Sequence, residues 1–530
     1  MGKYLAKRIL FSIFSLLVVV LVVMMLVYSL IDRNVIFQTD DLWNKKSGND
    51  QTYYEYSQWQ KYGYLTMTGY SSFLKTKYQA LLGDDYVNDA NYNADLAAIK
   101  SKSNYEKNES IKEFIAEYEG KGYEIKYLER ETYKSGRMQG KEKPGYGAYL
   151  FAVRENNPFQ RLWLYIKGLF TVETVNDVKD TNLTERYIRF EKDPYSGGFA
   201  IVGSGTTHKY LLYFDGRFPF IHQNFIHLNL GTSYTKYRGS EITQVITTPQ
   251  GALDVRTQQY PNMIGTDEYV ETAIDFHSLT YNSATREEDR ALYPDNYTTS
   301  VYHTKGLSML ENSFVIGLAA VIIAYLIGLP LGILMARRKD KLADKIGNLY
   351  IIFIMAVPSL AYIFMFAAIG TRVFNLPYKF ANAEIIFLAY ILPTVSLALR
   401  DIGGLMKWMR RYMIDQMNSD YVKFARAEGL SEGEIYRTHI SRNALIFIVH
   451  GIPGSIIGCL TGAIITERVY AVPGVGNLLT NAINGHDNGI IVACTVFYTS
   501  LSILSIILGD LLLAKYDPRI SLSDSKGGGR

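Results

Sequence analysis

Long uncharged apolar runs constrain the fold of this chain more than any other feature. An apolar helix of about 20 residues spans the hydrocarbon core of a bilayer. We therefore expect an all-α polytopic membrane domain of about six transmembrane helices, in which the fourth run is the shortest. The runs are Ile9–Ile31, Asn312–Ala336, Leu349–Thr371, Ile385–Leu399, Ala444–Thr466 and Gly489–Gly509. Prolines within them predict kinks; these are Pro330, Pro358, Pro393 and Pro453.

The first run is predicted to be a retained membrane anchor. It follows Lys3, Lys7 and Arg8, as the apolar part of a signal peptide would. A signal peptide, however, has a shorter apolar stretch and a cleavage site of small residues. This run is long enough to span the membrane and is followed directly by Asp32-Arg33.

Lysines and arginines in the short loops predict the orientation of the chain in the membrane. Most of them lie on one side if the N-terminus is cytoplasmic; they are Lys3, Lys7, Arg8, Arg337, Arg338, Lys339, Lys341, Lys345, Lys407, Arg410, Arg411, Lys515 and Arg519. The opposite loops carry fewer, mainly Arg372, Lys379 and Arg468. We therefore expect both termini in the cytoplasm and residues 32–311 outside the cell.

A polar, tyrosine-rich region between the first two runs is large enough to be a domain. The chain then divides into residues 1–31, the extracellular domain 32–311 and the membrane domain 312–530. Both cysteines, Cys459 and Cys494, lie in apolar runs. The extracellular domain therefore has no disulfide and depends on its core for stability. The net charge of +4 is small, and we expect no nucleic-acid partner.

The extracellular domain is predicted to be α+β. Tyr210–Ile221 consists of two aromatic runs around Asp215-Gly216, a strong β-hairpin signal, and Pro219 favours an edge position for its second strand. Further strands are expected at 122–129 and 146–153, and a helix over Asn108–Tyr123 that stops at Gly120.

A charged segment, Phe424–Leu445, lies between the fourth and fifth runs and is interrupted by glycines. Gly429 suits the left-handed position that ends a helix, so a first helix should end at Glu428. Ser431 and Glu434 have the spacing of a capping box, which would start a second helix.

The flanking residues Leu430 and Ile435 suit a hydrophobic staple. The segment is thus a specified helix–turn–helix. Local chemistry fits an amphipathic hairpin on the membrane surface as well as a docking element for a cytoplasmic partner.

The stretch around this turn resembles the cytoplasmic coupling motif of ABC importer permeases of the dipeptide/oligopeptide branch. The matching residues are Asp420, Tyr421, Val422, Ala425, Arg426, Ala427, Gly429, Leu430, Ser431, Arg442, Asn443 and Ala444, with Arg410 and Asp415 upstream. Glu428 departs from the motif, because a basic residue is common there. The resemblance implies that this stretch, including Glu434, docks into a groove on an ATPase subunit.

The C-terminal part supports the resemblance. Ile465–Ile483 resembles the outer loop that follows the fifth span in that branch. In it Glu467 precedes Pro473, Gly474 and Gly476, which would permit the sharp turn of a re-entrant segment.

The resemblance extends over nearly all of Ser313–Leu522, including Asp510 and the closing residues Asp517–Ile520. Leu228–Ile246 resembles the short outer segment that B-type permease subunits place before their second span. The longer region before it is similar to that of Ami-type permeases of Gram-positive bacteria.

Other classes of protein fit the sequence less well. The chain has no Walker A pattern, and Gly203–Tyr210 has the wrong spacing for one, so it cannot bind ATP through a P-loop of its own. It also has no G-x-S-x-G or H-E-x-x-H motif. His222 and His227 favour packing over metal binding. A secondary transporter usually has ionisable residues in mid-membrane, whereas the candidates His450, Glu467 and Asp510 lie near the ends of runs.

The resemblance implies a B-type permease subunit of an oligopeptide ABC importer, a type I permease fold that is not itself an enzyme. It would form half of the translocation path with a second, homologous permease in the cell membrane. Two cytoplasmic ATPases would bind ATP and Mg, while this chain binds no cofactor or metal. An extracellular lipid-anchored receptor would deliver the peptide. The alternative is a membrane-anchored extracellular peptide sensor without transport.

Overall fold

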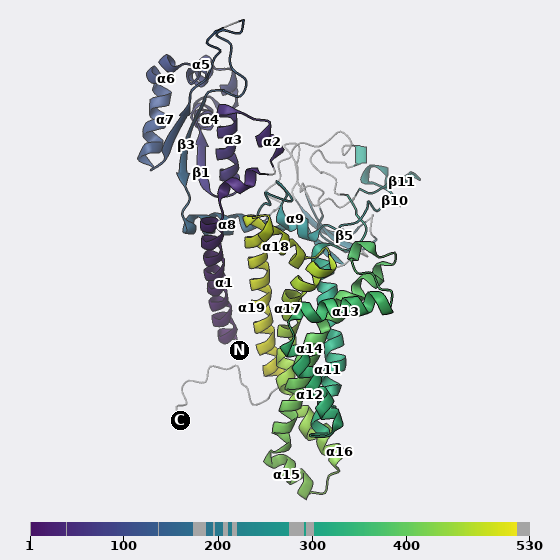
Figure 1. Cartoon of the computed structure of the whole chain (residues 1–530). Coiled ribbons are helices and arrows are strands. Elements are labelled where there is room, and N and C mark those ends of the chain that lie inside the picture. Colours follow the sequence, from purple (N-terminus) through teal and green to yellow (C-terminus); the bar gives the residue numbers. More distant parts are fainter. Residues whose placement is uncertain are drawn as a thin grey trace.

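The computed structural model describes residues 2–38, 40–135, 137–172, 187–193, 197–204, 210–214, 220–274, 291–292 and 302–516. Figure 1 shows a bundle of long helices with a sheet-containing domain at one end. We call this end of the bundle the domain end and the opposite one the far end. The inserted domain and the helical bundle together confirm the expected class, a polytopic membrane protein with a large α+β insertion.

Within the described residues, five helices are long and apolar enough to cross a membrane, or six if one bent pair counts as a span. The five are α1 (Gly2–Leu30), α11 (Met309–Arg337), α14 (Ile386–Met417), α17 (Arg442–Tyr470) and α19 (Asn488–Tyr516). Pro330, Pro393 and Pro453 lie inside α11, α14 and α17. The chain is therefore a multi-pass membrane protein.

The third run, predicted to be one span, is two helices. These are α12 (Leu342–Ala356) and α13 (Ser359–Val373), which are bent by 113° at the break. Pro358 has no N–H to continue the hydrogen-bond ladder, and its ring disfavours helical backbone at Val357. Val357 is accordingly extended, with φ −77° and ψ 131°.

The helix formed by the fourth run is longer than predicted. It was expected to end at Leu399, but α14 continues through Arg400 and Asp401 to Met417. Buried side chains recur at helical spacing beyond the run, at Ile402, Met406, Met409 and Met413. Burial of this face stabilises the helix despite the charged residues on its other faces.

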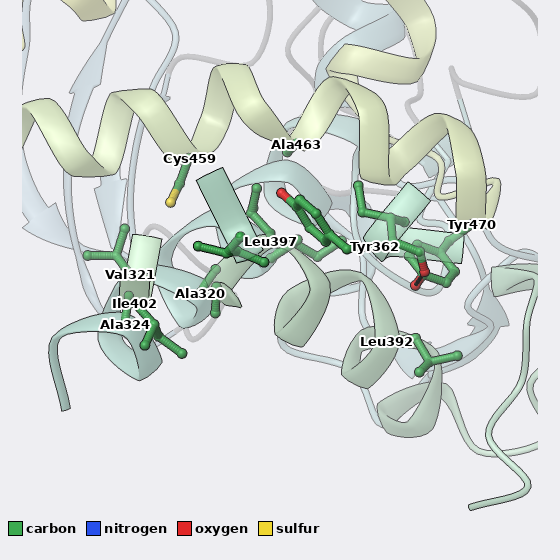
Figure 2. Close-up of a cluster of buried hydrophobic side chains, with 14 of the residues drawn as sticks. Ala320, Val321, Ala324, Tyr362, Leu392, Leu397, Ile402, Cys459, Ala463 and Tyr470 are labelled. Atoms are coloured by element: carbon green, nitrogen blue, oxygen red, sulfur yellow. Dashed lines mark hydrogen bonds between the residues drawn. The ribbon is translucent and has the colours of Figure 1, made fainter. Parts of the chain in front are cut away.

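The core of the bundle lies between α11, α12, α13, α14 and α17. Figure 2 shows part of it, including Ala320, Leu397 and Cys459. Small residues let α11 and α14 approach closely, since a Cβ on Gly328 would lie 3.0 Å from that of Leu405. The helix α1 packs on α19, where Arg8 forms an ion pair with Asp510 at 2.7 Å. This pair places the N-terminus and the C-terminal end of α19 at the far end.

One part of the inserted domain has a three-stranded antiparallel sheet in the order β1-β3-β2. The central strand β3 is buried from Leu150 to Val153, which explains its apolar run. Its strands are β1 (Leu65–Gly69), β2 (Glu124–Leu128) and β3 (Tyr149–Glu155). Its helices are α2 (Asp41–Asn44), α3 (Gly48–Lys61), α4 (Tyr70–Leu82), α5 (Ala90–Ala98), α6 (Lys102–Lys107), α7 (Glu109–Gly120) and α8 (Pro158–Leu169). The two predicted strands and the predicted helix, now β2, β3 and α7, are confirmed.

The other part has a four-stranded antiparallel sheet in the order β5-β6-β7-β8. Its strands are β5 (Ile188–Lys192), β6 (Phe199–Gly203), β7 (Tyr210–Phe214) and β8 (Ile221–Gln223). The predicted pairing of β7 with the strand that follows it is confirmed, and that strand, β8, lies at the edge of the sheet. The register differs from the prediction, because Phe214 pairs with Ile221 and β8 begins only at the last residue of the predicted hairpin. The turn predicted at 215–216 and Pro219 lie outside the described residues. Smaller elements are β4 (Phe170–Val172), β9 (Ile226–Leu228), α9 (Ile242–Thr247), β10 (Arg256–Gln258) and β11 (Val270–Thr272).

Candidate functional sites at the two ends of the bundle

A helical hairpin, residues 420–441, projects at the far end. It consists of α15 (Asp420–Ala427), a turn, α16 (Glu432–Glu434) and the π-helix η5 (Ile435–Ser441), which continues into α17. Figure 1 shows α15 and α16 beyond the ends of α11 and α12. The predicted helix–turn–helix is thus present.

The turn of the hairpin is closed by a glycine cap. Gly429 has φ +84°, in the left-handed region that favours glycine. Its N–H donates to the carbonyl of Arg426 at 3.1 Å, and the N–H of Leu430 donates to the carbonyl of Ala425 at 3.3 Å. These two bonds form a Schellman motif and confirm the capping role of Gly429.

The second helix begins with a cap from Ser431, whose Oγ accepts from the N–H of Glu434 at 3.3 Å. The return bond of a capping box is not made, and that half of the prediction is wrong. The side chain of Glu434 is exposed, and the carboxylate that closes the turn is Glu432. Arg426 Nε donates to Glu432 Oε1 at 2.8 Å, and this contact raises the pKa of Arg426 above its usual range.

Apolar packing fixes the base of the hairpin to the bundle. Buried Val422, Ala425 and Ile435 share a cluster with Met409 of α14 and Ala444 of α17. Leu430 packs against the same cluster, as a staple residue should. Tyr421 adds a hydrogen bond from its hydroxyl to Gln416 Oε1 at 2.6 Å. The hairpin is therefore a stiff extension of α14 and α17.

The tip of the hairpin is open to solvent. Phe424 is 65% exposed between the charged residues Lys423 and Arg426. An exposed aromatic ring surrounded by charges is typical of a protein contact surface. The other predicted docking residues that are exposed are Ala427, Glu428, Gly429, Ser431, Glu434 and Arg442, whereas Ala425 is buried and Tyr421 and Leu430 are half-buried.

A second candidate region, the buried loop of residues 467–488, lies at the domain end and contains α18 (Val475–Asn484). Glu467 is fully buried. Its Oε1 accepts from Ser313 Oγ at 2.7 Å and its Oε2 from the N–H of Asn477 at 2.9 Å. The carboxylate thereby ties the end of α17 to the start of α11 and of α18.

The glycines of this loop do not act as the sequence predicts. The sharp turn was expected at Pro473, Gly474 and Gly476, but it lies at Ala471, which has φ +53°. The next residue, Val472, donates its N–H to the carbonyl of Glu467. Gly474 and Gly476 have no positive φ; instead, a Cβ on Gly474 would collide with the Glu467 carboxylate, and a Cβ on Gly476 would collide with the backbone of Ile464. Both are needed for close packing, because any other residue would place a Cβ in space that the carboxylate or the helix α17 already fills.

Asp487 is a further buried carboxylate that sequence reasoning missed. Its Oδ2 accepts from Ser233 Oγ at 2.7 Å and from the N–H groups of Tyr234 and Thr235 at 3.1 and 3.2 Å. Its Oδ1 accepts from the N–H of Ile490 at 3.2 Å, which caps α19. Asp487 therefore fastens the inserted domain to the bundle through the segment 228–246. The resemblance of this segment to the outer segment of B-type subunits was the one sequence signal that could have pointed to this contact.

The remaining predicted candidates have structural partners. His222 stacks on Tyr213 with ring centroids 5.0 Å apart, as packing predicts. His450 Nδ1 lies 2.9 Å from the carbonyl oxygen of Gly509, and Asp510 pairs with Arg8.

Known proteins resemble this chain over its membrane part and over its whole length. The family described as "Binding-protein-dependent transport system inner membrane component" matches residues 328–522. The oligopeptide transport system permease protein AmiC of Streptococcus pneumoniae serotype 4 is 33% identical over 540 residues, which cover 100% of both chains.

Two other matches cover less than half of this chain. The dipeptide transport system permease protein DppB of Lactococcus lactis is 32% identical over 43% of this chain and 74% of its own. A solved structure of the MetNI methionine ABC transporter matches 39% of this chain and 94% of its own, with 14% identity and a TM-score of 0.33. The full-length similarity to AmiC shows that the chain belongs to the oligopeptide transport system permease family.

Proposed function

We propose that this chain is the B-type permease subunit of an ATP-driven oligopeptide importer and forms half of its translocation path. Full-length similarity to AmiC supports the substrate class, since that protein is named for oligopeptide transport. The second half of the path would come from a homologous permease. Because the chain has no Walker A pattern, ATP and Mg would bind to two separate ATPase subunits.

The stiff, open hairpin carries this proposal. Its base is buried between α14 and α17, while Phe424 and the charged residues around it are exposed. An ATPase that closes on ATP would push on Phe424–Leu445, and the glycine cap and apolar base would transmit that movement to α14 and α17. The membrane cavity would then switch between outward and inward access.

The proposed orientation places the far end in the cytoplasm. The far end contains the hairpin, both ends of the described chain and the basic residues Arg337, Lys407 and Arg411, in agreement with the positive-inside rule. The inserted domain would then be extracellular and would dock a lipid-anchored receptor that delivers the peptide. The similarity to AmiC of a streptococcus supports a location in the cell membrane of a Gram-positive bacterium.

Co-purification with a matched pair of variants tests the hairpin. Phe424→Ala should weaken ATPase binding by about thirtyfold or more, as truncation of an interface hot spot does. Phe374→Ala is the control, because Phe374 is 68% exposed but lies after α13, away from the hairpin. The tagged complex would be solubilised mildly, and its ATPases, second permease and peptide-stimulated ATP hydrolysis would be measured.

Loss of the ATPases from the Phe424→Ala complex alone is the expected result. Full co-purification and normal hydrolysis with this variant would exclude the hairpin as the coupling element. Tight peptide binding by a chain that never co-purifies with ATPases would favour the sensor.

A further inference from the structure

A polar stripe runs along one face of α14, from the middle of the helix to its far end. The stripe consists of Arg400, Gly404, Lys407 and Arg411, which recur at intervals of three and four residues. The three basic residues are exposed. The opposite face of α14 is buried against the bundle through residues such as Ile402, Met406 and Met409. The chain itself thus leaves the basic face of this helix uncovered.

The cations of the stripe form no ion pair within the residues that the structure describes. Within the described part of the chain, no carboxylate lies within salt-bridge distance of Arg400, Lys407 or Arg411. The neighbouring Arg410 is different, because its guanidinium donates to both oxygens of Asp344 at 2.6 and 2.7 Å. Asp401 faces the bundle, where its Oδ2 accepts from the Cys459 thiol at 2.7 Å.

Lipid is a costly covering for Arg400, because this residue lies well inside α14. Along α14 this residue lies about 21 Å from Ile386 and about 26 Å from Met417. A basic side chain near a helix end can extend to the headgroups, but one in the middle of the bilayer faces a water-filled cavity or a protein partner. This cost favours water or a protein partner over lipid at the exposed face of α14 around Arg400.

A cavity follows the stripe toward the far end. It has a volume of about 680 Å³ and lies between α12 and α14. Lys407, Arg410, Arg411 and Asp415 give it charge, and α12 contributes an apolar wall that includes Ile351 and Met355. The excess positive charge of this cavity would attract an anionic group, and its apolar wall would accept uncharged side chains of the same molecule.

Resting on the proposed function, we propose that this stripe lines the translocation path and binds the C-terminal carboxylate of the peptide in transit. A carboxylate is the group that every linear peptide with a free C-terminus shares, so its recognition would not depend on sequence. Arg400 would form the deepest contact, with charge-assisted hydrogen bonds from its guanidinium. Lys407 and Arg411 would attract the carboxylate as it moves toward the far end.

Transport by the complete complex in proteoliposomes tests the carboxylate contact. The probes are an oligopeptide with uncharged side chains and its C-terminal amide. Each variant's import rate is divided by that of the wild type for the same peptide, so that any receptor preference cancels. Arg400→Gln should lower import of the acid about tenfold, the effect of losing one charge-assisted hydrogen bond, and leave import of the amide unchanged.

Two variants are the controls. Arg400→Lys should retain most import of the acid, and Leu326→Ala, at an apolar residue of α11 that is 70% exposed, should import both peptides normally. Equal loss of both peptides, no loss of either, or loss of the second permease from the Arg400→Gln complex would overturn the carboxylate contact. Failure of the wild type to import either peptide would instead refute the proposed function.

Thiol labelling tests separately whether the stripe faces water. Cys459 and Cys494 are buried, so an introduced cysteine can be followed in the complete complex. Arg400→Cys should react with a water-soluble maleimide, and the acid peptide should slow the reaction, whereas Leu326→Cys should react little. Equal protection of both positions would show that the stripe faces lipid or protein and would overturn the proposal.

Discussion

The two ends of the bundle join their helices in opposite ways. At the far end, the helical hairpin exposes its charged tip and keeps only its base in the apolar cluster. At the domain end, the buried loop encloses two carboxylates, Glu467 and Asp487, and gives each several hydrogen bonds from the chain itself. The carboxylates of the loop are satisfied by the described residues of this chain, whereas the tip of the hairpin is exposed.

This difference teaches which region depends on which kind of interaction. Charges buried in the loop must keep their partners, because an unpaired buried charge is costly. Charges on the hairpin are solvated, and their ion pairs contribute little to stability. Substitutions in the loop should therefore affect folding of the chain, and substitutions at the tip should affect its partners.

The largest effect is expected at Asp487. Replacement by alanine would leave the buried donors of Ser233, Tyr234 and Thr235 without an acceptor and remove the cap of α19. The cost should be about 3–5 kcal/mol. Amide hydrogen exchange at Tyr234 and Thr235 should accelerate by at least about a hundredfold. Glu268→Ala, at an exposed position of the inserted domain, should leave these rates unchanged, and equal rates in both variants would contradict the anchoring role.

A matched pair of glycine substitutions should give the next largest difference. Gly474→Ala would force the Glu467 carboxylate away from Ser313 and Asn477, at a cost of about 2–4 kcal/mol. Gly433→Ala in α16 meets open space, and should be neutral or stabilising by up to about 1 kcal/mol, since alanine favours helix. Thermal unfolding of the solubilised complex measures both. Equal stability of the two variants would mean that the loop is not tightly packed.

The turn of the hairpin should show an effect on coupling without a defect in membrane insertion. Gly429→Val places a β-branched residue at φ +84°, which costs about 1–2 kcal/mol and misaligns the second helix. Peptide-stimulated ATP hydrolysis in lipid should fall by about tenfold. Gly429→Asn should retain most of it, because asparagine tolerates this conformation. Normal hydrolysis by a well-expressed Gly429→Val complex would remove the coupling role from the turn.

Features set by a few neighbouring residues could be predicted from the sequence. Gly429 and Ser431 act through bonds to residues within five positions, and the spans follow from uninterrupted apolar side chains. The strands β2 and β3 and the helix α7 were similarly predictable, because their apolar spacing reports the buried face.

Features that join distant residues could not be predicted. Asp487 meets Ser233 across 254 positions, and no local pattern marks that contact. Glu467 was identified by resemblance, but the reason that Gly474 must be glycine appears only when the carboxylate is placed beside it. The sequence predicts that the fourth span ends at Leu399, because the next residue, Arg400, is charged. Burial of the opposite face of α14, which depends on other helices, continues the span past it.

The smallest effect is expected for the exposed ion pair of Arg426 with Glu432. Their side chains are 42% and 60% exposed, so a double-mutant cycle of Arg426→Gln and Glu432→Gln should give only a small coupling energy at low salt. Salt should abolish it, since exposed charges are screened. Arg426→Gln should nevertheless slow association of the ATPase at low ionic strength, because charges at the edge of an interface govern encounter. A loss of stability as large as that of Gly474→Ala would mean that this ion pair, and not the glycine cap with its apolar base, holds the hairpin. The contrast between the two ends of the bundle would then fail.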